Sequence, residues 1–143
     1  MAFNKEKQNV SASQLLQAVA DGQDIHLSLC TVTGPLDINR LFESGETFDI
    51  SNLNLRQSPQ RKTITFSQSI VCDRCTFEDN VVFSAPWSEP ESVAVEFEAD
   101  VIFNRSVFKG QSRFRNAVFQ GTAGFDGCGF EGVVTFKKAC FCA

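Results

Sequence analysis

Cys72 and Cys75 are the residues whose type and spacing most directly suggest chemistry, because two cysteines separated by two residues occur in metal sites and redox-active dithiols. A zinc site needs further ligands, and no second ligand pair is visible in the sequence. The repeat described below gives both cysteines inward positions, where a free cysteine behaves as a small apolar side chain. Core packing is therefore the favoured interpretation and a metal site the alternative. We predict no metal and no cofactor.

The single histidine and the last two cysteines give weaker signals. Cys140 and Cys142 flank Phe141 and are expected to point outward, where an intermolecular disulfide or oxidation is the alternative to two inert thiols. His26 stands on the polar side of an alternating strand, without a serine or cysteine arranged for nucleophilic catalysis. Acid–base catalysis by carboxylates needs a dry cleft, which a tightly wound rod does not offer. We therefore predict that the protein is not an enzyme and has no catalytic residue.

Two irregular stretches form the candidate interaction site. Trp87, the one tryptophan, stands in an acidic stretch flanked by Pro86 and Pro90, where the ring either packs on the protein or is offered to a partner. Basic residues occupy the other stretch, and salt bridges between the two are the simpler interpretation. The candidate interaction corner consists of Arg56, Arg61, Lys62, Trp87, Glu89 and Glu91.

A phenylalanine repeat organises the chain around these residues. From Phe103 to Phe141, Phe recurs at alternating spacings of five and six residues, with a small or apolar residue two positions earlier. A fixed period of this kind indicates a repeat solenoid, and fifteen Phe against one Trp and no Tyr fit rings stacked in a dry interior. The predicted core ladder consists of Phe66, Phe77, Phe83, Phe97, Phe103, Phe108, Phe114, Phe119, Phe125, Phe130, Phe136 and Phe141.

The same spacing, traced towards the N-terminus, sorts the residues into four columns with a period of 22 residues. A looser copy of the repeat is expected at Leu36, Phe42, Phe48 and Leu53. Extra residues at 56–62 and 84–92 interrupt the columns at the same step, from the fourth column to the first. Both insertions are therefore expected at one corner, one above the other. The register of residues 25–38 stays open.

The N-terminal part differs from the repeat. Residues 1–10 are polar and expected to be loosely held. Residues 11–21 predict a short amphipathic helix, with a capping box from Ser11 to Gln14 and Gly22 as its left-handed C-terminal cap. Because about ten residues are marginal alone, we expect this helix to cover the N-terminal end of the solenoid. We divide the chain into an N-terminal segment with the capping helix, 1–23, and the repeat region, 24–143, within one domain.

Charge and hydropathy indicate in which cellular compartment the protein works. Residues 1–100 hold seven Lys/Arg and fifteen Asp/Glu, whereas residues 101–143 hold six and two, so an acidic part precedes a basic one. Met1 to Asn9 lacks the apolar run of a signal peptide, and no segment approaches the ~20 apolar residues of a membrane helix. We expect a cytoplasmic, reduced protein that does not contact membranes and has no structural disulfide.

Small residue, polar residue, Phe and two polar residues recur at Ser106–Gly110, Ala117–Gly121 and Cys128–Gly132. Over residues 36–141 the chain resembles the Phe-centred branch of the pentapeptide-repeat family. Variants of this kind are especially similar to bacterial, notably cyanobacterial, members of that family. The chain departs from the commonest pattern, alanine, Asp or Asn, then leucine. The resemblance implies an all-β solenoid: a right-handed quadrilateral β-helix of about four coils with a short N-terminal capping α-helix.

Three functions are compatible with these features. The favoured one is a non-catalytic protein-interaction or scaffold module with an unidentified protein partner. The alternative is a DNA mimic that regulates DNA gyrase or topoisomerase, as the resemblance implies for some members, and the basic C-terminal coils disfavour it. Nucleic-acid binding by the basic end has weak support. A homodimer through the C-terminal coils is expected, with head-to-tail contacts as its alternative.

Overall fold

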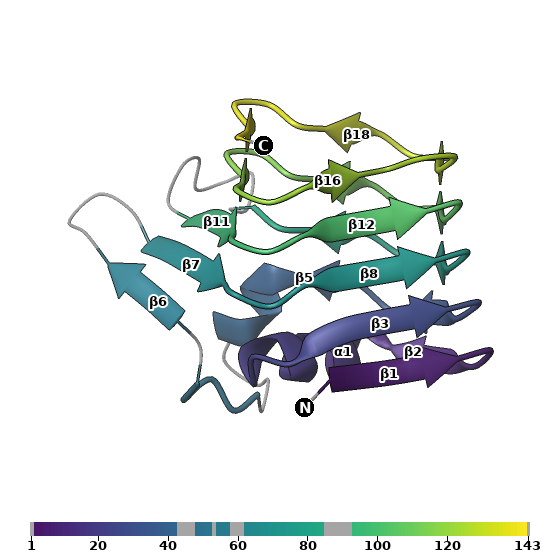
Figure 1. The fold of residues 1–143 in the computed structure, drawn as a ribbon, viewed down its shortest axis with the longest axis horizontal. Helices are drawn as coiled ribbons and strands as arrows, with labels where there is room; N and C mark the ends of the chain where they lie inside the picture. Colours follow the sequence, from purple (N-terminus) through teal and green to yellow (C-terminus); the bar gives the residue numbers. More distant parts are fainter. Residues whose placement is uncertain (1, 43–47, 53, 58–61, 85–92, 143) are drawn as a thin grey trace.

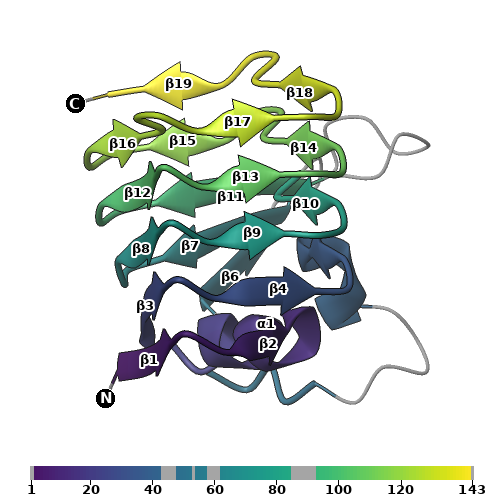
Figure 2. The same ribbon diagram turned by 90° about the vertical axis from the view of Figure 1, so that its right-hand side faces the viewer.

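The computed structural model describes residues 2–142 except 43–47, 53, 58–61 and 85–92. Its described strands form four sheets around one core, in which successive passages of the chain lie one above the other (Figures 1 and 2). All described strand pairs are parallel except β6 with β7. This arrangement is that of a β-helical solenoid, because each coil hydrogen-bonds to the coils before and after it.

Sheets A and B are the two sheets that begin nearest the N-terminus. Sheet A contains, in order, β1 (Ala2–Glu6), β3 (Asp24–Ser28), β8 (Ile70–Asp73), β12 (Val101–Asn104) and β16 (Ala123–Gly124). Sheet B contains β2 (Asn9–Ser11), β4 (Thr31–Thr33), β9 (Thr76–Phe77), β13 (Val107–Phe108) and β17 (Gly129–Phe130).

Sheets C and D complete the four sides. Sheet C contains β5 (Leu36–Asp37), β10 (Val81–Val82), β14 (Ser112–Arg113) and β18 (Val134–Thr135). Sheet D contains β6 (Asn54–Gln57), β7 (Lys62–Phe66), β11 (Val93–Phe97), β15 (Val118–Phe119) and β19 (Cys140–Phe141).

The helix α1 (Ala12–Ala20) has the predicted caps. Ser11 Oγ accepts from the backbone N–H of Gln14, and Gln14 Oε1 accepts from that of Ser11, both at 3.1 Å. At the other end Gly22 has φ of 73°, and the amides of Gly22 and Gln23 donate to the carbonyls of Val19 and Ala18. Leu15 and Val19 reach the core beneath the Phe rings, so α1 covers the N-terminal end of the rod (Figure 2).

The predicted core ladder is confirmed as four stacks of rings. Ring centroids are 5.5, 5.1 and 5.0 Å apart along Phe66, Phe97, Phe119 and Phe141. They are 4.9 Å apart along Phe77, Phe108 and Phe130, 5.7 and 5.2 Å along Phe83, Phe114 and Phe136, and 5.4 Å between Phe103 and Phe125. These spacings follow the separation of neighbouring strands, about 4.8 Å, and bury rings on rings.

The looser repeat copy predicted at residues 36–53 is wrong. Phe42 lies in the 3₁₀-helix η1 (Ile38–Phe42), Phe48 lies outside the sheets, and Leu53 lies outside the described residues. The strand registers instead pair Leu27 with Cys72, Val32 with Phe77 and Leu36 with Val81. The buried Leu27, Val32 and Ile38 keep the spacing of five and six, so the repeat continues here in aliphatic residues instead of Phe.

The expectation that residues 1–10 are loosely held is also wrong. β1 pairs with β3, and β2 pairs with β4, both in parallel. Lys5 is matched with Leu27, and Val10 with Val32, which is the 22-residue period of the repeat. Sheets A and B therefore begin before α1, within the segment assigned to the cap.

No helix among the described residues could span a membrane, since α1 has nine residues.

Candidate functional site

The step from sheet C to sheet D is where the coils differ in length. After Phe114 and Phe136 the chain reaches the next ring position at Phe119 and Phe141. In the two preceding coils, η1, β6 and residues 84–92 are inserted at this same step. Along the chain, both insertions therefore fall between a strand of sheet C and a strand of sheet D, which is the step that the sequence predicted. We call this place the C–D corner.

Only part of the predicted interaction set lies within the described residues. Arg56 belongs to β6 and is matched with Thr63 of β7, and Lys62 of β7 is matched with Gln57. The first insertion is therefore in part a hairpin that extends sheet D, and it begins earlier than predicted, directly after Ile38. The remaining predicted residues, Arg61, Trp87, Glu89 and Glu91, lie outside the described residues.

The C–D corner also carries cations that were not part of the predicted interaction corner. Arg115 and Asn116 make the turn between sheets C and D, and Lys137 and Lys138 make the same turn one coil later. The amide of Asn116 donates to the carbonyl of Lys137 at 2.9 Å, which shows that the two turns are adjacent. The sequence contained the signal: both pairs fall at the same place between consecutive Phe positions. Positive charge therefore gathers beside the insertions.

The corner between sheets A and B repeats one arrangement from coil to coil. The residue at the turn has a positive φ: 55° at Leu29, 55° at Arg74 and 49° at Arg105. The residue after it is small and points inward. The resulting column, which we call the thiol corner, consists of Cys30, Cys75, Ser106 and Cys128.

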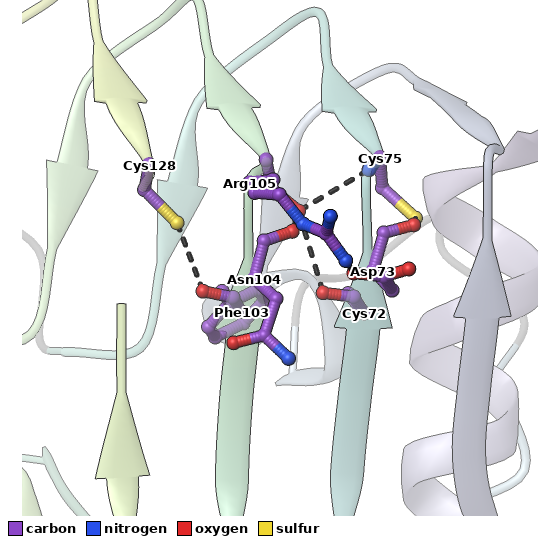
Figure 3. Close-up of polar contacts among 8 residues, drawn as sticks. Cys72, Asp73, Cys75, Phe103, Asn104, Arg105 and Cys128 are labelled. Atoms are coloured by element: carbon purple, nitrogen blue, oxygen red, sulfur yellow. Dashed lines mark hydrogen bonds and ion pairs between the residues drawn. The ribbon is translucent and has the colours of Figure 1, made fainter. Parts of the chain in front are cut away.

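Side chains of the thiol corner donate to backbone carbonyls. Three donate to the carbonyl two residues earlier: Cys30 Sγ to Ser28 O (3.4 Å), Cys75 Sγ to Asp73 O (3.5 Å) and Ser106 Oγ to Asn104 O (3.1 Å). Cys128 Sγ donates to the carbonyl of Phe103 at 2.9 Å (Figure 3). Because a serine fills the same role, this position selects a small donor, which supports the structural interpretation of Cys75 over a metal site.

Cys72 and Cys75 are 2% and 1% exposed, as expected for core residues. The hydrogen bond between the two thiols and burial raise the pKa of Cys72 well above its ordinary value. The same hydrogen bond lowers the pKa of Cys75 to about 7. The raised pKa of Cys72 governs the second ionisation, because two adjacent thiolates in an apolar core lack a counter-charge. The pair therefore holds at least one proton at neutral pH and is closed to solvent.

Charged side chains on the outside of this corner form an exposed pair. Arg105 Nη2 lies 3.2 Å from Asp73 Oδ1, and the two side chains are 56% and 34% exposed (Figure 3). Such a pair contributes about 0–1 kcal/mol. The pair therefore belongs to the solvent-exposed surface and does not form part of a reaction centre.

The remaining candidates lie apart from one another. His26 is exposed on the outer side of β3, beside a shallow groove that Asn4, Glu6 and Asp73 also line. Cys140 and Cys142 are exposed, as predicted, and their Sγ atoms are 3.1 Å apart. Within the described part of one chain, no three His, Cys, Asp or Glu side chains gather closely enough to hold a metal ion.

Comparison with known proteins bears on the repeat alone. Residues 94–139 match the family model for pentapeptide repeats (9 copies). No curated protein and no solved structure matches the chain. The match covers the part in which the Phe spacing is most regular, and the described strands before it continue the same parallel registers. The chain therefore carries pentapeptide repeats over residues 94–139.

Proposed function

We propose that this protein is a non-catalytic protein-interaction module, built as a right-handed quadrilateral β-helix of bacterial type, and that its specificity resides at the C–D corner. One observation carries the proposal: both insertions interrupt the step from sheet C to sheet D. In the coils that follow α1, the described steps between the other sheets stay short. Insertions are tolerated in solenoids where they leave the stacked core intact, and they commonly supply the binding face.

The surroundings of the corner suit recognition. The stacked rings form a stiff support, with Phe97, Phe114 and Phe119 at most 1% exposed, so a partner meets a surface that needs little ordering. Arg115, Lys137 and Lys138 supply positive charge next to an insertion whose sequence contains Glu89, Glu91 and Trp87. An aromatic anchor surrounded by a polar rim is a common arrangement at protein interfaces.

The test is affinity capture from the source cell with three forms of the chain. The first is wild type, and the second replaces residues 85–92, which include Trp87, by a short turn. The third, Lys7→Ala with Arg74→Ala, removes two exposed cations from the opposite A–B corner and serves as the matched control. We expect a protein that is retained by wild type and the control and lost from the corner variant.

Thermal unfolding must show that all three forms are folded. Equal loss of the captured protein from the control and the corner variant would contradict the proposal. So would capture that survives removal of the corner.

The alternative of a DNA mimic that regulates gyrase stays disfavoured, for a reason of surface charge. Carboxylates stand at or near the ends of the sheet A strands: Glu6, Asp24, Asp73, Asp100 and Asp126. Exposed cations stand beside them at the A–B corner: Lys7, Arg74 and Arg105. A duplex mimic needs one unbroken acidic face. Inhibition of gyrase supercoiling at sub-micromolar protein would reverse this ranking.

Two further proposals concern setting and assembly. We place the protein in the cytoplasm, because six free cysteines suit a reducing compartment. We also propose a homodimer through the last coil, where Val133, Val134 and Phe141 are 69%, 39% and 53% exposed. Light scattering at high micromolar concentration tests the dimer, and a monomer there would refute it.

A further inference from the structure

The last described coil presents a strand edge that no other described strand covers. Strands β16, β17, β18 and β19 each stand last in their sheets, with a hydrogen-bonded neighbour on one side only within the described chain. Phe141 is 53% exposed at this edge, whereas Phe119 directly beneath it is 1% exposed. Edges of this kind pair readily with another strand.

The hydrogen bonds of β19 define how such a strand would align. The amides of Cys140 and Cys142 donate to the preceding coil, to the carbonyls of Ala117 and Phe119, at 2.8 and 2.9 Å. Backbone groups of successive residues in a strand point to opposite edges. The N–H and C=O of Phe141 therefore face the open edge.

A second copy can satisfy both groups through a two-fold axis at Phe141. In an antiparallel pair, two opposed residues exchange both hydrogen bonds, and the flanking pairs lie closest, with about 4.5 Å between Cα atoms. Phe141 would then oppose the partner's Phe141. Cys140 would oppose the partner's Cys142, and the reverse, with all four side chains on the outer face. One chain supplies two thiols 3.1 Å apart, and two chains bring four together.

We propose that two copies of this chain form a tetrathiolate site for Zn²⁺ from Cys140 and Cys142 of each copy; this rests on the proposed C-terminal homodimer. Zn²⁺ takes four cysteine sulfurs tetrahedrally at about 2.3 Å, which requires sulfurs about 3.8 Å apart. The thiol pair of one chain needs to open by less than about 1 Å to reach that spacing. Binding releases the four thiol protons to solvent and forms four Zn–S bonds.

Size and charge favour a second copy as the occupant of this end. The last coil spans residues 120–141, which matches the about 20–30 residues a side of a standard protein interface. Its charges balance, with Asp126 and Glu131 against Lys137 and Lys138. Two such ends therefore meet without net repulsion.

The test titrates the reduced full chain with Co²⁺, the spectroscopic substitute for Zn²⁺, and follows the visible bands of tetrahedral tetrathiolate coordination. We expect saturation at one metal ion per two chains. Light scattering in parallel should show that Zn²⁺ lowers the dimer dissociation constant at least tenfold. The double variant Cys140→Ser, Cys142→Ser should lose both responses.

Cys128→Ser is the matched control, because it removes a thiol of the same coil at a column where Ser106 already stands. This control should bind metal as wild type does. Saturation at one ion per chain, absence of tetrathiolate bands, or bands that persist in the double variant would overturn the metal site. A dimer that forms without metal, also in the double variant, would support the homodimer proposal. The Co²⁺ titration would then test the metal site separately. A wild type that stays monomeric with and without Zn²⁺ would refute both.

Discussion

At the scale of single residues, the cysteines are explained by position rather than by motif. Cys75 occupies a column in which the side chain donates to a backbone carbonyl beside a residue of positive φ. Cys72 occupies a ring position, where it stands against Phe103. Beside Cys72 remains an apolar cavity of about 20 Å³ lined by Leu15, Val19 and neighbouring rings. Apolar cavities stay dry, so the smaller side chain costs packing and creates no polar site.

The thiol pair predicts a pH dependence of stability. Unfolded cysteines ionise near pH 8.5, whereas the raised pKa keeps Cys72 protonated in the fold. Above pH 8.5 the unfolded chain therefore binds fewer protons, and the free energy of unfolding falls by up to about 1.4 kcal/mol per pH unit. Below pH 8.5 the lowered pKa of Cys75 acts in the opposite sense, because the folded chain then binds fewer protons than the unfolded chain. Urea unfolding from pH 8.5 to 10 therefore measures the decline.

The reference variant combines Cys72→Val, which fills the cavity, with Cys75→Ser, which copies Ser106 and keeps a donor. It should lose less stability than wild type between pH 8.5 and 10. Parallel pH profiles for the two proteins would show that the pair does not titrate as proposed.

At the scale of elements, the corners hold the coils in register. Three corner side chains accept the backbone N–H of the next coil: Asp24 from Ser69 (2.9 Å), Asn80 from Gln111 (2.9 Å) and Asp100 from Thr122 (3.0 Å). Turns that stack this closely leave no room for side chains where backbone meets backbone. Glycine is therefore required at the tightest of them.

Gly110 tests this close approach. A Cβ added there would lie 2.6 Å from Asn80 Oδ1 and 2.7 Å from the carbonyl carbon of Asp79. Because backbone must shift, Gly110→Ala should lower the free energy of unfolding by about 1–3 kcal/mol. Gly129→Ala is the control, since a Cβ there meets nothing within 4 Å, and its effect should stay within about 0.5 kcal/mol. Equal effects in denaturant unfolding would show that coil spacing is not limiting.

At the scale of the whole molecule, depth along the rod decides what each ring contributes. Rings of the inner coils are sealed from above and below, and α1 covers the N-terminal end. Within the described chain, rings of the last coil have stacked neighbours on one side only. The same residue type at the same repeat position therefore has different energetic weight.

Phe119→Ala and Phe141→Ala compare two such rings of one stack. Phe119 is 1% exposed between Phe97 and Phe141, so its truncation should cost about 3–5 kcal/mol. Phe141, 53% exposed, should cost less than about 1.5 kcal/mol in chemical unfolding at concentrations where light scattering shows a monomer. Similar costs for both would mean that the end of the rod is covered even then.

The amino-acid sequence by itself determined the solenoid, the twelve-ring ladder and the capped helix, because side-chain spacing repeats wherever backbone geometry repeats. It also located both insertions at one step. It failed for residues 1–10 and 36–53, where Val10, Leu27, Val32 and Ile38 carry the period in aliphatic form and polar residues hide the strands.

Only the tertiary structure decided which residues from different coils meet. Strand pairing brought Arg115 and Lys137 to the C–D corner and set Cys75 against Ser106 as hydrogen-bonding neighbours. It also left the backbone N–H and C=O of Phe141 pointing away from the preceding coil. Contacts between coils depend on the lengths of the insertions and on the choice of register, which are long-range properties that local spacing does not encode.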